Sequence, residues 1–211
     1  METSQDWHDW AAGNRKIASE KAAPALTFTE ANFRRRLSQL SKMTVQVVHD
    51  VFEESGADRN SVKLAFVSMR GEIDRQLKIN KSLIEENEIL PAGFSLSVFN
   101  APVALATIAE KLKGGYDAIY PSRGNFRLGF ISAVSSVLCG AEKELVFVYG
   151  DELVPECYNG FAPEENIPLS YAFIVTSEAG NNVIMVDIDD ISESPVGFLK
   201  QIVRTSLKNS L

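Results

Sequence analysis

The sequence predicts an α/β fold in which a mixed, mostly parallel sheet of five or six strands carries helices on both faces. Short apolar or alternating segments, typical of strands, alternate along the chain with longer amphipathic segments, typical of helices. This order favours a parallel sheet. The composition is that of an ordinary globular protein, with 45% hydrophobic and 23% charged residues among 211,.

The N-terminal part begins with a lead-in over residues 1–33, which we predict to be irregular or partly helical and to pack on the body over 34–211. A helix is predicted over 38–55, because apolar residues recur at three- and four-residue spacing and Gly56 follows them,. Residues 62–68 alternate and then run apolar, as a strand does,. Apolar residues at helical spacing predict a second helix over 71–87,.

The central part follows the same alternation. Phe94 to Val98 alternates strictly between apolar and polar residues, which predicts a strand,. A helix over 101–113 comes next, with Pro102 in its first turn and Gly114 and Gly115 at its end,.

The remaining elements complete the predicted sheet. A short strand is expected over 117–121, then a helix over 125–139 that ends at Gly140, and a strand over 145–149. Residues 171–176 and 183–187 predict two strands paired through a turn at 180–182, which gives the sheet an antiparallel edge,. An amphipathic helix over 196–209 closes the chain.

Two of these helices are apolar on every side. Residues 101–109 hold one polar side chain, Thr107, and residues 128–141 carry no charge. A helix that is apolar all round must be covered all round, but the sheet covers one side only. Either the lead-in and the closing helix cover the rest, or a second chain does. We expect a second chain, because a large apolar patch rarely persists on a monomer.

Charge and cysteine content exclude several classes. The net charge of −7 comes mainly from residues 141–193, which we interpret as a solvated acidic face, and a nucleic-acid binder would need the opposite sign,. The longest uncharged apolar run, 128–141, is shorter than the ~20 residues of a membrane span, and the N-terminus does not resemble a signal peptide, so we expect a cytoplasmic protein,. Cys139 and Cys157 are the only cysteines, which excludes a disulfide framework and a zinc cluster,.

Four segments occur in an order that points to one family. They are Phe33–Leu37, Ser68–Glu72, Phe94–Ala109, and Asp117–Tyr120 with the apolar helix after it. Together they resemble the N-terminal half of β-ketoacyl synthases, and more closely the truncated ketosynthase-like proteins of aryl polyene and type II polyketide systems. The resemblance implies that residues 34–211 form half of a thiolase-like fold, with the helix over 101–113 in its buried middle layer.

The resemblance also implies where catalysis would lie. Ketosynthases carry a catalytic cysteine at the start of this helix, where the helix dipole lowers the pKa of a thiol. Here Phe99 and Asn100 occupy that position, and no cysteine is near them in the sequence. The family also needs two histidines from its second half, but no histidine follows His49, which we place on a solvated helix face. We therefore predict that the chain is not an enzyme and has neither a cofactor nor a metal.

The function that the resemblance implies is that of a chain length factor, a non-catalytic subunit that heterodimerises with a full-length ketosynthase. It would shape the acyl tunnel of its partner in polyketide, aryl polyene or fatty-acid-like biosynthesis, with Phe99 and Asn100 bordering the tunnel. The predicted partner interface comprises Phe94, Ser95, Leu96, Ser97, Val98, Ala101, Val103 and Leu105. Arg34, Arg35 and Arg36 are candidate contacts for an acidic acyl carrier protein.

Other classes of function stay open. The chain could be a homodimeric α/β interaction protein without an enzymatic partner, using the same apolar surface. A small hydrolase or acyltransferase could use Ser97 or Ser122, although the sequence lacks a G-x-S-x-G elbow,. The acidic group Asp187, Asp189 and Asp190 lacks the spacing of a calcium loop, so we do not predict a cation there,.

Overall fold

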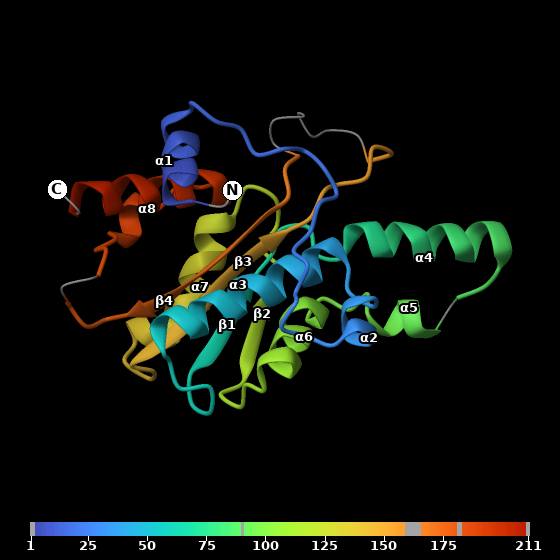
Figure 1. The fold of residues 1–211 in the computed structure, drawn as a ribbon, viewed down its shortest axis with the longest axis horizontal. Helices are drawn as coiled ribbons and strands as arrows, with labels where there is room; N and C mark the ends of the chain where they lie inside the picture. The colour runs from blue at the N-terminus through green and yellow to red at the C-terminus, as the bar shows by residue number, and fades with distance from the viewer. Residues whose placement is uncertain (1–2, 90, 159–165, 181–182, 210–211) are drawn as a thin grey trace.

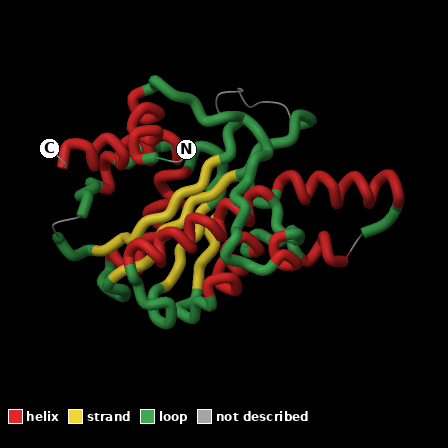
Figure 2. The backbone as a smooth tube through the Cα atoms, viewed as in Figure 1, coloured by secondary structure: helices red, strands yellow, loops and turns green. Residues whose placement is uncertain are grey.

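One twisted sheet runs through the centre of the molecule, with helices on both of its faces (Figures 1 and 2). The computed structural model describes residues 3–209 except 90, 159–165 and 181–182. The strand order is β2-β1-β3-β4. The strands are β1 (Lys63–Val67), β2 (Tyr116–Ile119), β3 (Glu144–Asp151) and β4 (Leu169–Thr176). β2, β1 and β3 are parallel and β4 is antiparallel, so the predicted mostly parallel sheet with an antiparallel edge is confirmed.

The first face of the sheet is covered by α3 (Gln39–Ser55) and α6 (Ala101–Glu110). Because side chains alternate along a strand, Leu64 and Phe66 of β1 point to this face and pack against the inner side of α3,. Ser38 caps the start of α3, since its hydroxyl accepts a hydrogen bond from Ser41 N–H at 2.9 Å, and Gly56 ends the helix with φ +67°,.

The opposite face is covered by α7 (Phe126–Leu138), with α1 (Ser4–Ala12) and α8 (Pro195–Asn209) beyond it. An aromatic cluster fills this core, and Phe130 lies 4.8 Å, centroid to centroid, from both Phe147 and Phe198. The lead-in contributes Trp10, which is buried, and its Ala11 carbonyl accepts hydrogen bonds from Arg204 of α8. The N-terminal helix α1 therefore packs against α8 and the aromatic core.

A helical arm leaves the carboxyl end of β1. It consists of α4 (Ile73–Glu86) and the short α5 (Pro91–Ser95), and Figure 1 shows α4 projecting away from the rest of the molecule. Neither helix has a buried residue. The arm returns through a turn at 96–100 to α6, while α2 (Ala31–Arg34) lies near its base in Figure 1.

The predicted strand over 94–98 is wrong. These residues form the end of α5 and a turn, in which the N–H groups of Leu96 and Ser97 bond to the carbonyls of Gly93 and Phe94. Among the described residues no strand lies beside this segment to pair with it, and local hydrogen bonds satisfy its backbone instead,.

The predicted strand over 183–187 is also wrong, and among the described residues the sheet has four strands rather than five or six. Residues 183–187 form no ladder with β4, and Val186 packs through its side chain against the aromatic core. Of the turn predicted at 180–182, residues 181 and 182 lie outside the described residues.

The helix predicted over 101–113 ends earlier, at Glu110. Lys111 adopts φ +55° and closes the helix, and its N–H bonds to the Ile108 carbonyl. Gly114 is required for a different reason: a Cβ there would lie 2.2 Å from the carbonyl oxygen of Val62, so only glycine lets the chain pass β1 this closely,. In the described part of the chain, no helix is long and apolar enough to cross a lipid bilayer.

Candidate partner-binding face and buried polar network

The turn before α6 is held by side chains from two other segments. Gln76 of α4 donates through Nε2 to the Ser97 carbonyl at 2.9 Å. The hydroxyl of Tyr120, just after β2, donates to the Phe99 carbonyl. These contacts fix the position of the start of α6, where the resemblance to ketosynthases implied a nucleophile.

Phe99 and Asn100 occupy that start and differ in what they contact. The Phe99 ring is 64% exposed and rests on the Tyr120 ring, with centroids 4.7 Å apart. The Asn100 side chain does not cap α6; instead it donates through Nδ2 to the Tyr116 hydroxyl at 2.9 Å. The helix N-terminus therefore faces an aromatic side chain rather than a reactive group.

The residues predicted for the partner interface divide by burial. Phe94, Ser95, Val98 and Phe99 are exposed. Leu96, Asn100 and Leu105 are half-buried, whereas Ser97, Ala101 and Val103 are buried within the chain's own fold. The outer side of α6 adds Ile108, whose side chain is 65% exposed. An apolar surface thus runs over α5, the turn and α6, and the described part of the chain leaves it exposed.

Neither the cysteines nor the histidines lie at the start of α6. Cys139 and Cys157 are exposed and belong to the end of α7 and to a loop after β3. His8 lies on α1, and His49 contacts Glu110 at the opposite end of α6. The two ends of α6 are nine residues apart, which corresponds to about 13 Å along the helix axis,. Ser97 has a hydroxyl near this position, but it donates to the Phe94 carbonyl at 2.8 Å.

A buried polar network occupies the carboxyl ends of β1 and β3. Asp151 accepts hydrogen bonds from the hydroxyls of Ser68 and Tyr149, at 2.8 and 2.5 Å, and from the backbone N–H groups of Met69 and Arg70, both at 3.0 Å. The Arg70 Nε lies 3.6 Å from the same carboxylate. Burial raises the pKa of Asp151, and the Arg70 charge opposes that shift,.

The next residue, Glu152, joins two helix N-termini. Its carboxylate accepts from Leu40 N–H of α3 at 3.3 Å and from Asp74 N–H of α4 at 3.0 Å. Both N–H groups belong to the first turn of a helix and therefore have no acceptor within their own helix. A negative charge at a helix N-terminus is favourable because of the helix dipole. Burial nevertheless raises the pKa of Glu152 to about 7, because the side chain is almost completely removed from water,.

Glu72 completes the base of the arm. Its carboxylate accepts from the hydroxyls of Ser38 and Ser41, at 2.6 and 2.7 Å, and from Arg75 Nε at 3.0 Å.

The interpretation of residues 141–193 as a solvated acidic face was wrong for Asp151 and Glu152, which are 3% and 2% exposed. Asp151 is the last residue of β3 and Glu152 follows it, and the continuous apolar run just before them was the sequence signal that this end of the strand is buried,.

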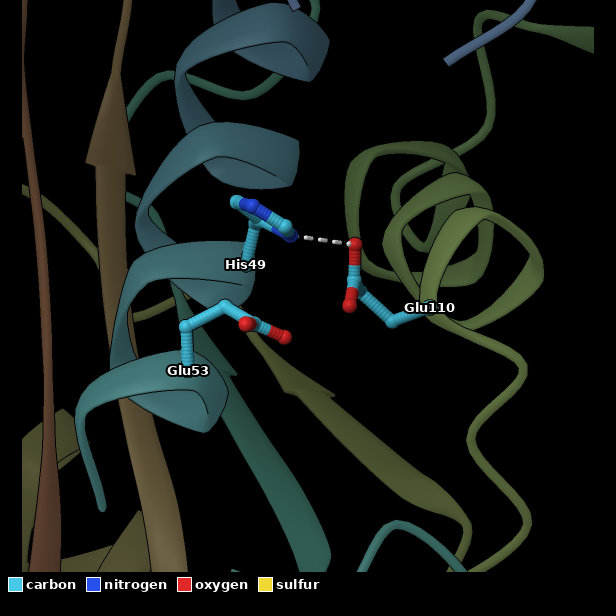
Figure 3. Close-up of side chains that lie close together, drawn as sticks. All are labelled: His49, Glu53 and Glu110. Carbon is cyan, nitrogen blue, oxygen red and sulfur yellow. Dashed lines mark hydrogen bonds and ion pairs between the residues drawn. The ribbon is translucent and has the colours of Figure 1, made fainter. Parts of the chain in front are cut away.

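His49 lies in a second cluster, between α3 and α6 (Figure 3). Its Nδ1 lies 3.0 Å from Glu110 Oε1, and Glu53 lies one helical turn further along α3. Candidate ligand atoms of these three residues lie within 4.8 Å of one another, which is close enough for a metal ion. However, Arg59 NH2 already lies 2.6 Å from Glu53 and 3.2 Å from Glu110, so a cation would have to displace a guanidinium.

The placement of His49 on a solvated helix face was wrong. The ring is half-buried, because Phe28 of the lead-in stacks on it with centroids 3.6 Å apart and planes 8° apart. The lead-in thus covers one side of the contact between α3 and α6.

The three arginines proposed to meet a carrier protein have different surroundings. Arg34 is half-buried and donates through NH1 to the Leu26 and Thr29 carbonyls, which holds the lead-in against α2. Arg35 and Arg36 are exposed, and Arg35 donates to Asn32 at 3.4 Å. Of the three, only Arg35 and Arg36 are exposed to solvent.

Comparisons with known proteins agree with this architecture. A family profile described as the N-terminal domain of β-ketoacyl synthase matches residues 7–200. Among solved structures, a chain described as "Ketosynthase (ApeO) in Complex with its Chain Length Factor (ApeC) from Xenorhabdus doucetiae" superposes with a TM-score of 0.77 at 20% identity. The match covers 97% of this chain and 86% of that chain, and at this identity it establishes the fold. No curated protein matches the sequence.

Proposed function

Because the chain belongs to the family of β-ketoacyl synthase N-terminal domains, we propose that it is a chain-length-factor-like subunit that pairs with a full-length ketosynthase. The pair would act in polyketide, aryl polyene or fatty-acid-like biosynthesis. The observation that carries the proposal is the start of α6, which Gln76 and Tyr120 hold in place and which exposed apolar side chains surround. Phe99 lies there, at the position where the resemblance to ketosynthases places the nucleophile. The similar fold found in a complex of a ketosynthase with its chain length factor supports this choice.

The chain itself would be non-catalytic. Claisen condensation needs a thiolate to attack and donors to stabilise an enolate. No cysteine precedes Cys139 in the sequence, and His49 is engaged by Glu110 at the far end of α6. The buried pair Ser68 and Asp151 is no substitute, because Ser68 is 0% exposed and no histidine contacts it among the described residues.

The proposed interface combines the exposed part of the predicted residues with the free edge of the sheet. Phe94, Val98 and Phe99 contribute apolar area, and Ile108 extends it along α6. β2 is the edge strand on this side and, within the described residues, pairs only with β1. Apolar surface of this kind is typical of a protein interface.

Phe99 is the residue we propose to border the acyl tunnel of the partner, with Asn100 beside it. Its ring is the largest exposed group at the start of α6, so truncation would leave space for a longer acyl chain. We expect Phe99→Ala to shift the product distribution of the reconstituted pair towards longer chains, measured by mass spectrometry. An unchanged distribution with unchanged binding would remove Phe99 from the tunnel.

Co-purification tests the pairing. The chain would be co-expressed with each full-length β-ketoacyl synthase of its source organism, and the affinity of the complex would be measured. We expect Val98→Asp to weaken binding at least tenfold, because it buries a charge in an apolar contact. Met185→Asp is the matched control, since Met185 is an exposed apolar residue of the C-terminal part. Failure of every ketosynthase to bind the unaltered chain would contradict the proposal.

A contact with an acyl carrier protein is a separate part of the proposal. The double reversal Arg35→Glu with Arg36→Glu leaves the Arg34 side-chain contacts to the lead-in intact. We expect it to lower the rate of carrier-protein-dependent turnover of the pair, most strongly at low salt. An unchanged rate would assign these arginines to ordinary solvated surface.

A further inference from the structure

The α4–α5 arm has more exposed apolar surface than its own chain explains. Ile84 is 82% exposed, Phe94 is 57% exposed, and Leu83 and Ile89 are 44% and 43% exposed. A helix of 14 residues in water is marginally stable without packing,. In the described part of the chain, α4 buries no residue against the body.

The base of the arm is firmly held, in contrast to its tip. Glu152 binds the N-terminus of α4, Lys21 lies 2.7 Å from Asp74, and Gln76 bonds to the turn before α6. The direction of the arm is therefore set by the fold. α4 spans about 21 Å, and in Figure 1 it extends past the side of the sheet on which β2 lies.

We propose that the α4–α5 arm is a clasp that extends over the ketosynthase partner, an inference that rests on the proposed function. The turn at 96–100 belongs to both surfaces, because Gln76 links it to α4 while Val98 and Phe99 lie in the proposed interface. A partner seated against that interface and the β2 edge meets the arm that projects on the same side. Contact with the partner covers Ile84 and Ile89, which the chain itself leaves exposed.

The charges on the arm indicate the chemistry of the surface that it meets. Near the base, Arg75 pairs with Glu72 and Lys78 pairs with Asp74. Glu85, Glu86 and Glu88 follow towards the tip, with Lys81 before them, and in the described residues none of the three glutamates forms an ion pair. The partner surface is therefore an apolar patch bordered by lysine or arginine side chains.

The decisive variant is the double substitution Ile84→Ser with Ile89→Ser, and Met185→Ser is the control. Ile84, Ile89 and Met185 are 82%, 43% and 78% exposed and belong to neither hydrophobic core, so neither variant should disturb the core. Circular dichroism of each variant checks this directly. We expect the arm variant to raise the Kd for the ketosynthase at least tenfold, while the control leaves it unchanged. Replacing Glu85 and Glu86 by glutamine makes the affinity less sensitive to salt.

The outcomes separate this inference from the proposed function. Binding that Val98→Asp weakens but the arm variant does not would overturn the clasp and leave the pairing intact. A chain that binds no ketosynthase would overturn both. A chain that forms its own dimer, broken by the arm variant, would assign the arm to a second copy and likewise overturn the inference.

Discussion

Helices α3 and α4 flank the same strand and have the same kind of amphipathic sequence, yet one lies in the core and the other projects into solvent. α3 buries seven residues, among them Leu40, Val45 and Phe52, against the sheet and α6. α4 buries none. Periodicity specifies that a helix has an apolar side, but what covers that side depends on the chain's path and on other molecules.

The largest effect is expected where the chain covers its own helix. Phe52 is 1% exposed, and Phe52→Ala should lower the free energy of unfolding by ~3–5 kcal/mol because it leaves a cavity under α3,. Urea denaturation measures the loss. A cost below about 1 kcal/mol would mean that α3 is not anchored in the core in solution.

The link between the two helices should have the next largest effect. Glu152→Ala removes the acceptor of two backbone N–H groups, one at each helix start, and should cost ~1–3 kcal/mol,. Hydrogen exchange should then rise at the first turns of both α3 and α4. Faster exchange at neither helix would show that the carboxylate does not hold them together.

The same residue predicts a pH dependence. The folded chain holds the Glu152 proton up to a pKa of about 7, whereas the unfolded chain releases it near the ordinary value of 4.5. The folded state thus binds more protons between these values, and the free energy of unfolding should fall as the pH rises from 4.5 to 7. Glu152→Gln should make that fall shallower, leaving the part due to Asp151, and an unchanged slope would contradict the shift.

The polar contact between α3 and α6 should contribute less to the free energy of unfolding than Glu152 does, because the side chains of His49 and Arg59 are partly exposed to water. Glu110→Gln should lower the free energy of unfolding by about 1 kcal/mol,. Added Zn²⁺ should leave the Tm of the unaltered chain unchanged, since Arg59 already neutralises the cluster. A rise in Tm with Zn²⁺ that disappears in Glu110→Gln would instead identify a metal site.

The smallest effect on stability is expected at the tip of the arm. Ile84→Ala should change the free energy of unfolding by less than about 0.5 kcal/mol, because the side chain has little to lose in the isolated chain,. The measurement is again urea denaturation. A cost above about 1 kcal/mol would place the arm against its own body and remove the contrast with α3.

Much of the fold could be predicted, because it follows from local patterns. The spacing of Leu40, Val48 and Phe52 gave α3, and the buried run around Val146 gave β3. The errors came where a local pattern competed with tertiary context. The alternation of residues 94–98 fits a strand, but whether a strand forms depends on a neighbouring edge that no local pattern reveals.

The candidate site was harder to predict than the fold. The sequence predicted that a helix begins at Ala101, and α6 does begin there, with Asn100 at its N-cap. That Phe99 and Asn100 occupy the position of the missing nucleophile stays a prediction. However, the acidic segment 141–193 contains exposed acidic side chains as well as the buried Asp151 and Glu152. Residue type alone does not tell the two groups apart, so all of them were predicted to lie on the surface. Phe28 and His49 stack although they are 21 positions apart in the sequence, and no sequence motif predicts this contact.

The edge position of β2 has a consequence for the solution behaviour of the isolated chain. Exposed strands act as templates on which unrelated chains aggregate. This strand is only four residues long, and its Asp117, paired with Lys63 at 2.7 Å, places a charge on it. A short, charged edge of this kind disfavours pairing with unrelated strands, so the isolated chain should resist growth into fibrils.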